Sequence, residues 1–275
     1  MCIRDRCVII SIFLVTAIFS VADMMIRTQS DRMTGKNGSW HIELDGISQE
    51  TALKIAERDD VVSIGAVTIF NPDGELPYRM DGKRVVLYGI DESYLTMNST
   101  GAAEGRFPQG MGEIMLSSNA ARVLQVAVGD TVTLRTPSGD WDFTVSGLGG
   151  VEESYYSGQY SLMDAYLPRT AFAALMEQNN VHNLQTSYYV QFTSASKAAK
   201  AIPELTAQHN LPENAVSENT GVMAIAGQSD SSAAKNVYSL AAVLFVLVLL
   251  AGVLMISGSM NSNLAQRIQF FGMMR

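Results

Sequence analysis

Two long apolar segments lie near the ends of this chain, and a polar stretch of mixed periodicity separates them. Residues 239–260 carry no charge, and residues 7–26 carry only one, Asp23. About 20 apolar residues in a helix span the roughly 30 Å hydrocarbon core of a bilayer. The pattern therefore predicts two transmembrane helices, at 7–26 and 239–260. Asp23 lies near one end of the first helix, where a carboxylate can stay hydrated at the membrane interface.

The second apolar segment continues into an amphipathic stretch over residues 261–275. Its apolar positions recur at helical spacing: Met260, Leu264, Ile268, Phe271 and Met274. This spacing predicts one apolar stripe along a helix. Two cations in this stretch, Arg267 and Arg275, place it on the cytoplasmic side by the positive-inside rule. Two spans then put the N-terminal end in the cytoplasm as well.

The first apolar segment has a second interpretation, a cleaved signal peptide. Arg4 and Arg6 would form its basic region, and residues 20–22 a small-residue cleavage site. The sequence MCIRDR at residues 1–6 also resembles translated sequencing-adaptor sequence. We therefore treat residues 1–6 as a candidate non-native leader, and the arginines in it are not used for topology.

The central segment, residues 27–235, is strongly acidic. It holds 15 Lys and Arg against 25 Asp and Glu, a net charge of −10, whereas the whole chain carries −8. This balance argues against nucleic acid and anionic lipid headgroups as direct partners. Both cysteines, Cys2 and Cys7, lie at the N-terminal edge, so the central segment has no disulfide. A cysteine-free outer domain is typical of a bacterial extracytoplasmic protein.

The central segment alternates helix and strand patterns. Ser48 predicts the N-cap of a helix through Arg58, with Leu53 and Ala56 facing inward, and residues 61–70 form a strand pattern. A second strand and helix follow at residues 187–192 and 196–207, the helix interrupted near Pro203. We expect an α+β domain with two lobes, a split α+β lobe and a β-rich inserted lobe at about 75–148.

Three linked pieces make residues 104–134 the most patterned part of the chain. They read E-G-R-x-P from Glu104, G-E-I-x-L-S from Gly112 and V-G-D-x-V-x-L from Val128. In this order they resemble the MacB-like periplasmic core domain of FtsX/MacB-type ABC transporter permeases. The tail L-x-x-R-I-x-x-F-G-x-x-R at residues 264–275 resembles the segment that follows a transmembrane helix in the same family. Physically, Glu104, Arg106 and Asp130 are interpreted as turn and ion-pair residues.

The sequence offers no catalytic, cofactor-binding or metal-binding residues. No G-x-x-x-x-G-K-[ST] phosphate loop is present, so the chain does not itself bind ATP in a P-loop. His41, His182 and His209 are isolated from one another, without metal-ligand spacing. The central segment lacks thiols. We therefore predict that the protein is not an enzyme.

The resemblance implies a permease subunit that works with a separate cytoplasmic ATPase. The ATPase would contact the amphipathic segment at Arg267, Phe270, Phe271, Met274 and Arg275. The family also implies a dimer with a second permease copy or half, a location in the bacterial cytoplasmic membrane, and two further membrane helices after Arg275. Members move lipoproteins, peptides or drugs, or transmit signals to cell-wall enzymes.

The alternative function is a sensor with two spans around an extracytoplasmic ligand domain. Such receptors continue past the second span into a charged heptad linker. Residues 261–275 carry only two charges, Arg267 and Arg275, which favours the permease.

Overall fold

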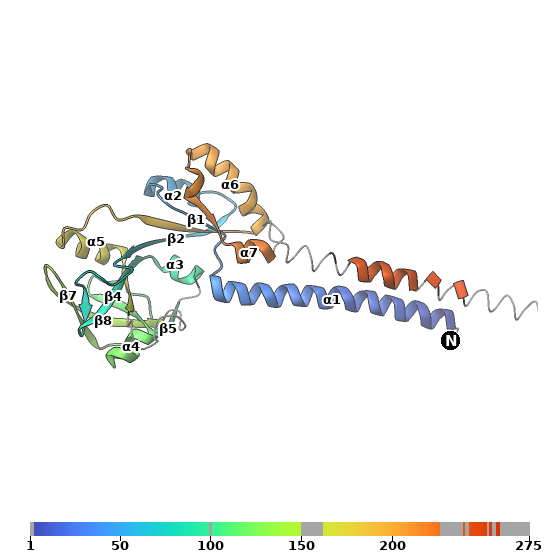
Figure 1. Cartoon of the computed structure of the whole chain (residues 1–275), viewed down its shortest axis with the longest axis horizontal. Coiled ribbons are helices and arrows are strands. Elements are labelled where there is room, and N and C mark those ends of the chain that lie inside the picture. The colour runs from blue at the N-terminus through green and yellow to red at the C-terminus, as the bar shows by residue number, and fades with distance from the viewer. Residues whose placement is uncertain are drawn as a thin grey trace, which may run out of the picture. The chain divides into compact units, whose positions relative to one another are not determined.

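The computed structural model describes residues 3–98, 101–149, 162–225, 239, 242–251, 253–254 and 257–258. The chain divides into two compact units, one made of residues 1–32 and 224–275 and the other of residues 33–223. Helix α1 (Ile3–Asn37) begins in the first unit and ends in the second (Figure 1). It contains the predicted helix 7–26. Within the described ranges, no helix combines the length and the apolar content that a bilayer crossing needs.

A closed barrel of six strands forms one part of the unit 33–223. Its order is β4 (Lys83–Ile90), β3 (Arg79–Met80), β7 (Thr131–Thr136), β8 (Gly139–Gly149), β6 (Glu113–Ser117) and β9 (Leu162–Pro168). Parallel pairing of β9 with β4 closes the ring. A further strand, β5 (Ala102–Gly105), pairs with β8 but is not one of the six barrel strands. Two helices, α4 (Ser118–Leu124) and α5 (Arg169–Gln178), bury side chains in the same core as the barrel strands.

Four outer strands extend the barrel sheet through β4. Their order is β11 (Val216–Glu218), β1 (Ile42–Leu44), β10 (Thr186–Phe192) and β2 (Val61–Phe70), with β2 paired to β4. Helices α2 (Gln49–Ala56) and α6 (Ala195–His209) share a core with these strands, and α3 (Glu92–Met97) packs in a separate cluster with β2 and β10. A short 3-10 helix, Glu213–Ala215, precedes β11, and α7 (Thr220–Ile225) follows it. The expected α+β class is confirmed.

Local signals placed many of these elements correctly. Ser48 caps α2, and its hydroxyl accepts a hydrogen bond from the N–H of Thr51 at 3.1 Å. The predicted burial of Leu53 is wrong, because 58% of its surface is exposed, while Ala52 and Ile55 face the core. In so short a helix the apolar residues are compatible with two different buried faces, and packing against the sheet determines which face is buried.

Two other expectations differ from the structure. Helix α6 runs unbroken through Pro203. Burial of Ala198, Ala201 and Leu205 against the sheet holds this helix together despite the hydrogen bond that proline cannot make. The barrel also takes in β9, which lies beyond the range 75–148 expected for the β-rich lobe.

Candidate functional site

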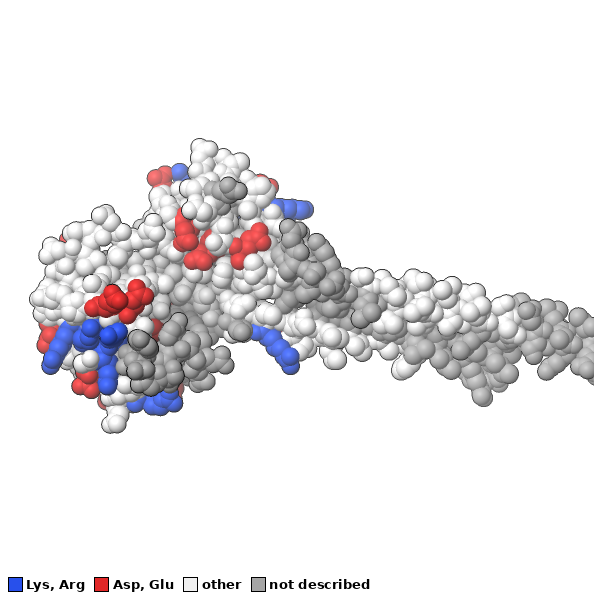
Figure 2. Space-filling view, in the orientation of Figure 1, with Lys and Arg blue, Asp and Glu red and all other residues white. Residues whose placement is uncertain are grey.

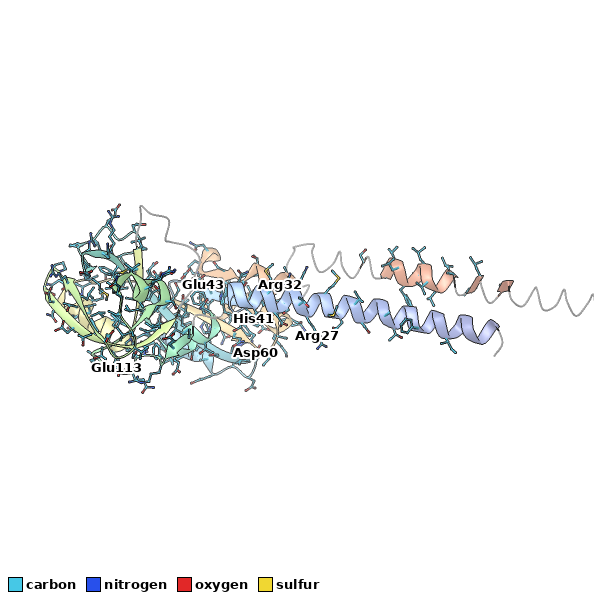
Figure 3. All side chains as sticks on the ribbon, turned by 90° about the horizontal axis from the view of Figure 1, so that it is seen from below. Arg27, Arg32, His41, Glu43, Asp60 and Glu113 are labelled. Atoms are coloured by element: carbon cyan, nitrogen blue, oxygen red, sulfur yellow. The ribbon has the colours of Figure 1, made fainter. Side chains whose placement is uncertain are left out.

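The arginine and the glutamate of the patterned segment form an ion pair that organises a loop. Arg106 follows β5, and its Nη1 donates to Oε2 of Glu113 at 2.9 Å. The same Oε2 accepts the backbone N–H groups of Gln109 at 2.8 Å and Gly110 at 3.1 Å. These bonds, led by that from Arg106, hold the pKa of Glu113 at about 2. Glu113, labelled in Figure 3, therefore fixes the loop 106–113 on the barrel.

Replacing Glu113 by glutamine should destabilise the domain by only about 1 kcal/mol at pH 7, because solvent screens the partly exposed ion pair. The folded pKa is depressed, so the stabilisation exists above the ordinary pKa and is lost as pH falls toward 2. Urea unfolding, followed by the fluorescence of Trp40 and Trp141, measures this effect at pH 7 and near pH 2. The control is Glu104→Gln, on exposed β5. An equal loss at both pH values would contradict this role for the carboxylate.

Asp130, the third charged residue singled out in this segment, closes a turn. Its Oδ2 accepts the N–H of Ala127 at 2.8 Å just before β7 begins. Arg106 forms an ion pair and Asp130 closes a turn, as expected for these two residues, whereas Glu104 is exposed on β5. These contacts stabilise the loop and the turn on the barrel.

The segments through which the chain enters and leaves the unit 33–223 meet at one buried asparagine. Asn219 is 3% exposed and lies between β11 and α7. Its Nδ2 lies 3.3, 3.5 and 3.0 Å from the carbonyl oxygens of Asn37, Gly38 and Trp40. Its backbone N–H donates to the carbonyl of His41 at 2.9 Å. We call Asn37, Gly38, Trp40, His41 and Asn219 the domain junction.

Asn219 also starts the outgoing helix. Its Oδ1 accepts the N–H of Val222, in the first turn of α7, at 3.3 Å. The N–H of Met223 donates to the carbonyl of Asn219 at 2.9 Å. One side chain thus bonds the end of α1 and the beginning of α7. The chain passes to the other unit within α1 and within α7. The junction therefore links the two helices through which the chain enters and leaves the unit 33–223.

His41 anchors the junction to the outer sheet. Its backbone N–H donates to the carbonyl of Val190 at 2.9 Å, and its Nδ1 accepts the N–H of Phe192 at 3.1 Å. The imidazole is 8% exposed, and this burial lowers its pKa. The ring is therefore neutral at physiological pH and accepts a hydrogen bond from β10 just before β1 begins.

Beside the junction lies a half-buried cluster of aromatic rings and carboxylates. Tyr189 donates to Oε1 of Glu43 at 2.7 Å. Its ring packs edge to face with those of Trp40 and Tyr94, at distances of 4.9 and 5.1 Å between ring centroids. Burial raises the pKa of Glu43, and burial next to acidic groups raises that of Tyr94 to about 12. The hydrogen bond from Tyr189 ties β10 to β1, so the cluster braces the sheet under α3.

A groove of about 400 Å³ runs along α5. Five apolar residues and five polar or charged residues line it. The apolar ones are Phe172, Ala173, Met176, Val181 and Leu184, and the others are Thr68, Arg169, Glu177, His182 and Thr186. Across the described ranges no group of three His, Cys, Asp or Glu residues could hold a metal ion.

The residues predicted to contact an ATPase lie outside the part of the chain that the structure describes: Arg267, Phe270, Phe271, Met274 and Arg275. The residues that the sequence did not single out are those of the junction. Asn219 gave no signal, because one asparagine between two polar residues is not distinguishable from a turn residue. A buried asparagine is recognised only by the carbonyl groups that surround it.

Comparison with known proteins gives a family match over most of the chain. The model of the MacB-like periplasmic core domain matches residues 7–208. The periplasmic region of MacB from Actinobacillus actinomycetemcomitans is 14% identical, with 72% of this chain and 97% of that chain covered and a TM-score of 0.49. The extracellular domain of the ABC-type transporter YknZ from Gram-positive bacteria is 16% identical, with 65% and 98% covered and a TM-score of 0.45. No curated protein matches the chain.

Proposed function

This chain belongs to the family of MacB-like periplasmic core domains, and from that membership we propose that it is a permease subunit of an ABC transporter. A separate cytoplasmic ATPase would supply the energy, and the permease would convert it into movement of the extracytoplasmic domain. The movement would export or extract a lipoprotein, peptide or drug, or signal to cell-wall enzymes. The observation that carries the proposal is the family match over residues 7–208, which favours a permease over a two-span sensor.

In this proposal residues 7–26 and 239–260 cross the bacterial cytoplasmic membrane and residues 27–235 lie outside it. Apolar side chains that a soluble domain would bury are exposed along both segments; Phe13 and Leu254 are 70% and 71% exposed. Asp23 pairs with Arg27 at 2.8 Å, which suits the interface at the end of the first span. Of the two segments, residues 239–260 are described only in part.

The junction supports a role in transmission. Force on either connection would reach Asn219 and the strands that flank it, β1 and β11, which pair with each other. From β1 it would pass through β10 and β2 to β4 and so to the barrel, which we treat as a second lobe. We further propose that the permease pairs with a second copy or half, as the family implies.

The contact with the ATPase is tested by Phe271→Asp. A carboxylate in the apolar stripe of residues 261–275 should abolish co-purification of the full-length protein with the ATPase encoded beside it, because a charge cannot be buried in an apolar groove. Affinity purification from membranes, with immunoblotting for the ATPase, measures the result.

The matched control is Gln266→Asp, which adds the same charge off the stripe. Loss of the ATPase with both variants would indicate a general charge effect. Retention of the ATPase by Phe271→Asp would remove the case for this face.

A further inference from the structure

Three arginines stand directly opposite one another on neighbouring barrel strands. Arg84 of β4 pairs with Arg79 of β3, and Arg79 pairs with Arg135 of β7. We call these residues the arginine row. Figure 2 shows Lys and Arg gathered on the barrel side of the domain. The next partner of Arg135 is Asp140 of β8, so the row ends in an acidic residue.

All three arginines lie on the outer wall of the barrel. Side chains alternate along a strand, and the neighbours Met80, Val85 and Leu134 are fully buried in the barrel core. Arg84 and Arg135 are exposed, and Arg79 is partly exposed. The row is therefore available to a molecule that approaches this wall.

The row carries three positive charges against the single negative charge of Asp140. Arg79 donates through Nη1 to the carbonyls of Leu76 at 2.5 Å and Tyr78 at 2.8 Å, which orients it but leaves its charge. Among the described residues, the guanidinium groups of Arg84 and Arg135 form no ion pair or side-chain hydrogen bond. Like charges directly opposite on adjacent strands are destabilising. An anionic partner would relieve that repulsion.

We propose that the arginine row docks an acidic helix of a partner protein. Neighbouring strands lie about 4.8 Å apart, which is close to the roughly 5–6 Å between helix side chains three or four residues apart. Carboxylates in an extended peptide lie about 6.6 Å apart at alternate positions, a poorer match. The occupant would carry three acidic residues one turn apart, with a basic residue in the next turn facing Asp140.

The sign pattern favours a protein over a lipid surface. A bilayer face of anionic headgroups is uniformly negative, so it would match the three arginines but would place a like charge against Asp140 at the end of the row. A bilayer would also face more of residues 27–235 than a short helix would, and their 15 basic and 25 acidic residues give −10. A helix can present three negative charges to the row and a positive one to Asp140.

The test measures binding of a fluorescein-labelled, alanine-rich peptide with Glu at i, i+4 and i+8 and Lys at i+12, by anisotropy with the full chain in detergent. We expect saturable binding that weakens steeply between about 50 and about 200 mM salt. The double variant Arg84→Gln, Arg135→Gln should weaken it at least about tenfold. The matched control Lys197→Gln, Lys200→Gln removes two charges from α6 and should leave binding unchanged.

Arg79 is left intact because its bonds to Leu76 and Tyr78 hold the loop before β3. Circular dichroism checks that both variants fold. Equal weakening by the two double variants, equal binding of a peptide with Gln in place of Glu, or no binding at all would overturn the proposal. So would row-dependent binding of soluble dihexanoyl phosphatidylserine in place of the peptide, which would make the row a lipid contact.

Discussion

Replacing Asn219 by alanine is expected to lower the free energy of unfolding of the domain by about 2–4 kcal/mol, because each buried polar group left unpaired costs about 1–3 kcal/mol. The variant would remove the side-chain donor that lies near the carbonyls of Asn37, Gly38 and Trp40. It would also remove the acceptor for the N–H of Val222 at the start of α7. Urea unfolding followed by tryptophan fluorescence measures the loss.

A matched control is Asn179→Ala. Asn179 ends α5, far along the chain from the junction. Its side chain donates to the carbonyl of Leu175 at 2.8 Å and accepts the N–H of Ser138 at 3.2 Å. We expect a loss of only about 1 kcal/mol there, since the freed groups at a partly exposed helix end can bond to water. A variant of Asn219 no more harmful than this control would mean that the junction is not held by its side chain.

Asn219→Asp separates the two roles of the side chain. Aspartate keeps an acceptor for the N–H of Val222 but has no N–H to offer the carbonyls at the end of α1. If the tie to α1 dominates, this variant should be at least as unstable as Asn219→Ala. If capping of α7 dominates, it should be close to wild type. The comparison therefore decides which of the two connections Asn219 mainly holds.

Local sequence signals were sufficient for elements whose stabilising contacts are close in sequence. Ser48 and Thr51 form a cap within four residues, and Asn71 and Gly74 close a turn through a backbone hydrogen bond of 2.9 Å. The strand over 61–70 was found because its apolar run ends at this turn. In each case the pattern and the contact that stabilises it lie in the same short segment.

Closure of the barrel could not be predicted from local sequence signals. It depends on parallel pairing of β4 with β9, whose partners Val85 and Met163 are far apart in the chain. Parallel strands need a long connection between them, so no turn signals which strands will pair. Strand β3, Arg79–Met80, is too short to show an alternation at all. The arginine row is hidden for the same reason, because it exists only once β3 and β7 are in register.

The contact between β5 and β8 is a middle case, because the sequence pattern includes Gly105 but gives no reason for a glycine there. Gly105 pairs with Gly147 across β5 and β8 and has a φ of +71°, which other residues adopt at a cost. A Cβ on Gly147 would lie 2.4 Å from the carbonyl oxygen of Arg106, and one on Gly105 would lie 2.4 Å from that of Ser146. Two backbones approach here too closely for any side chain.

Gly147→Ala is therefore expected to destabilise the domain by about 3 kcal/mol, at the upper end of the cost of overpacking, because the atom that the new methyl group meets is backbone and cannot rotate away. The control is Gly112→Ala in the same segment, where a Cβ meets no atom within 4 Å and the cost should be under about 0.5 kcal/mol. Urea unfolding of the three proteins measures both changes.

The effect should reach Glu113 as well. The N–H of Arg106 donates to the carbonyl of Ser146 at 2.9 Å, so the displacement that relieves the clash must break or stretch this bond and move the guanidinium that pairs with Glu113. Gly147→Ala should then also reduce the loss of stability between pH 7 and pH 2, since that loss depends on the ion pair. An unchanged pH dependence in a destabilised Gly147→Ala would mean that β5 shifts without Arg106, and that the ion pair holds the loop independently of the contact between the two glycines.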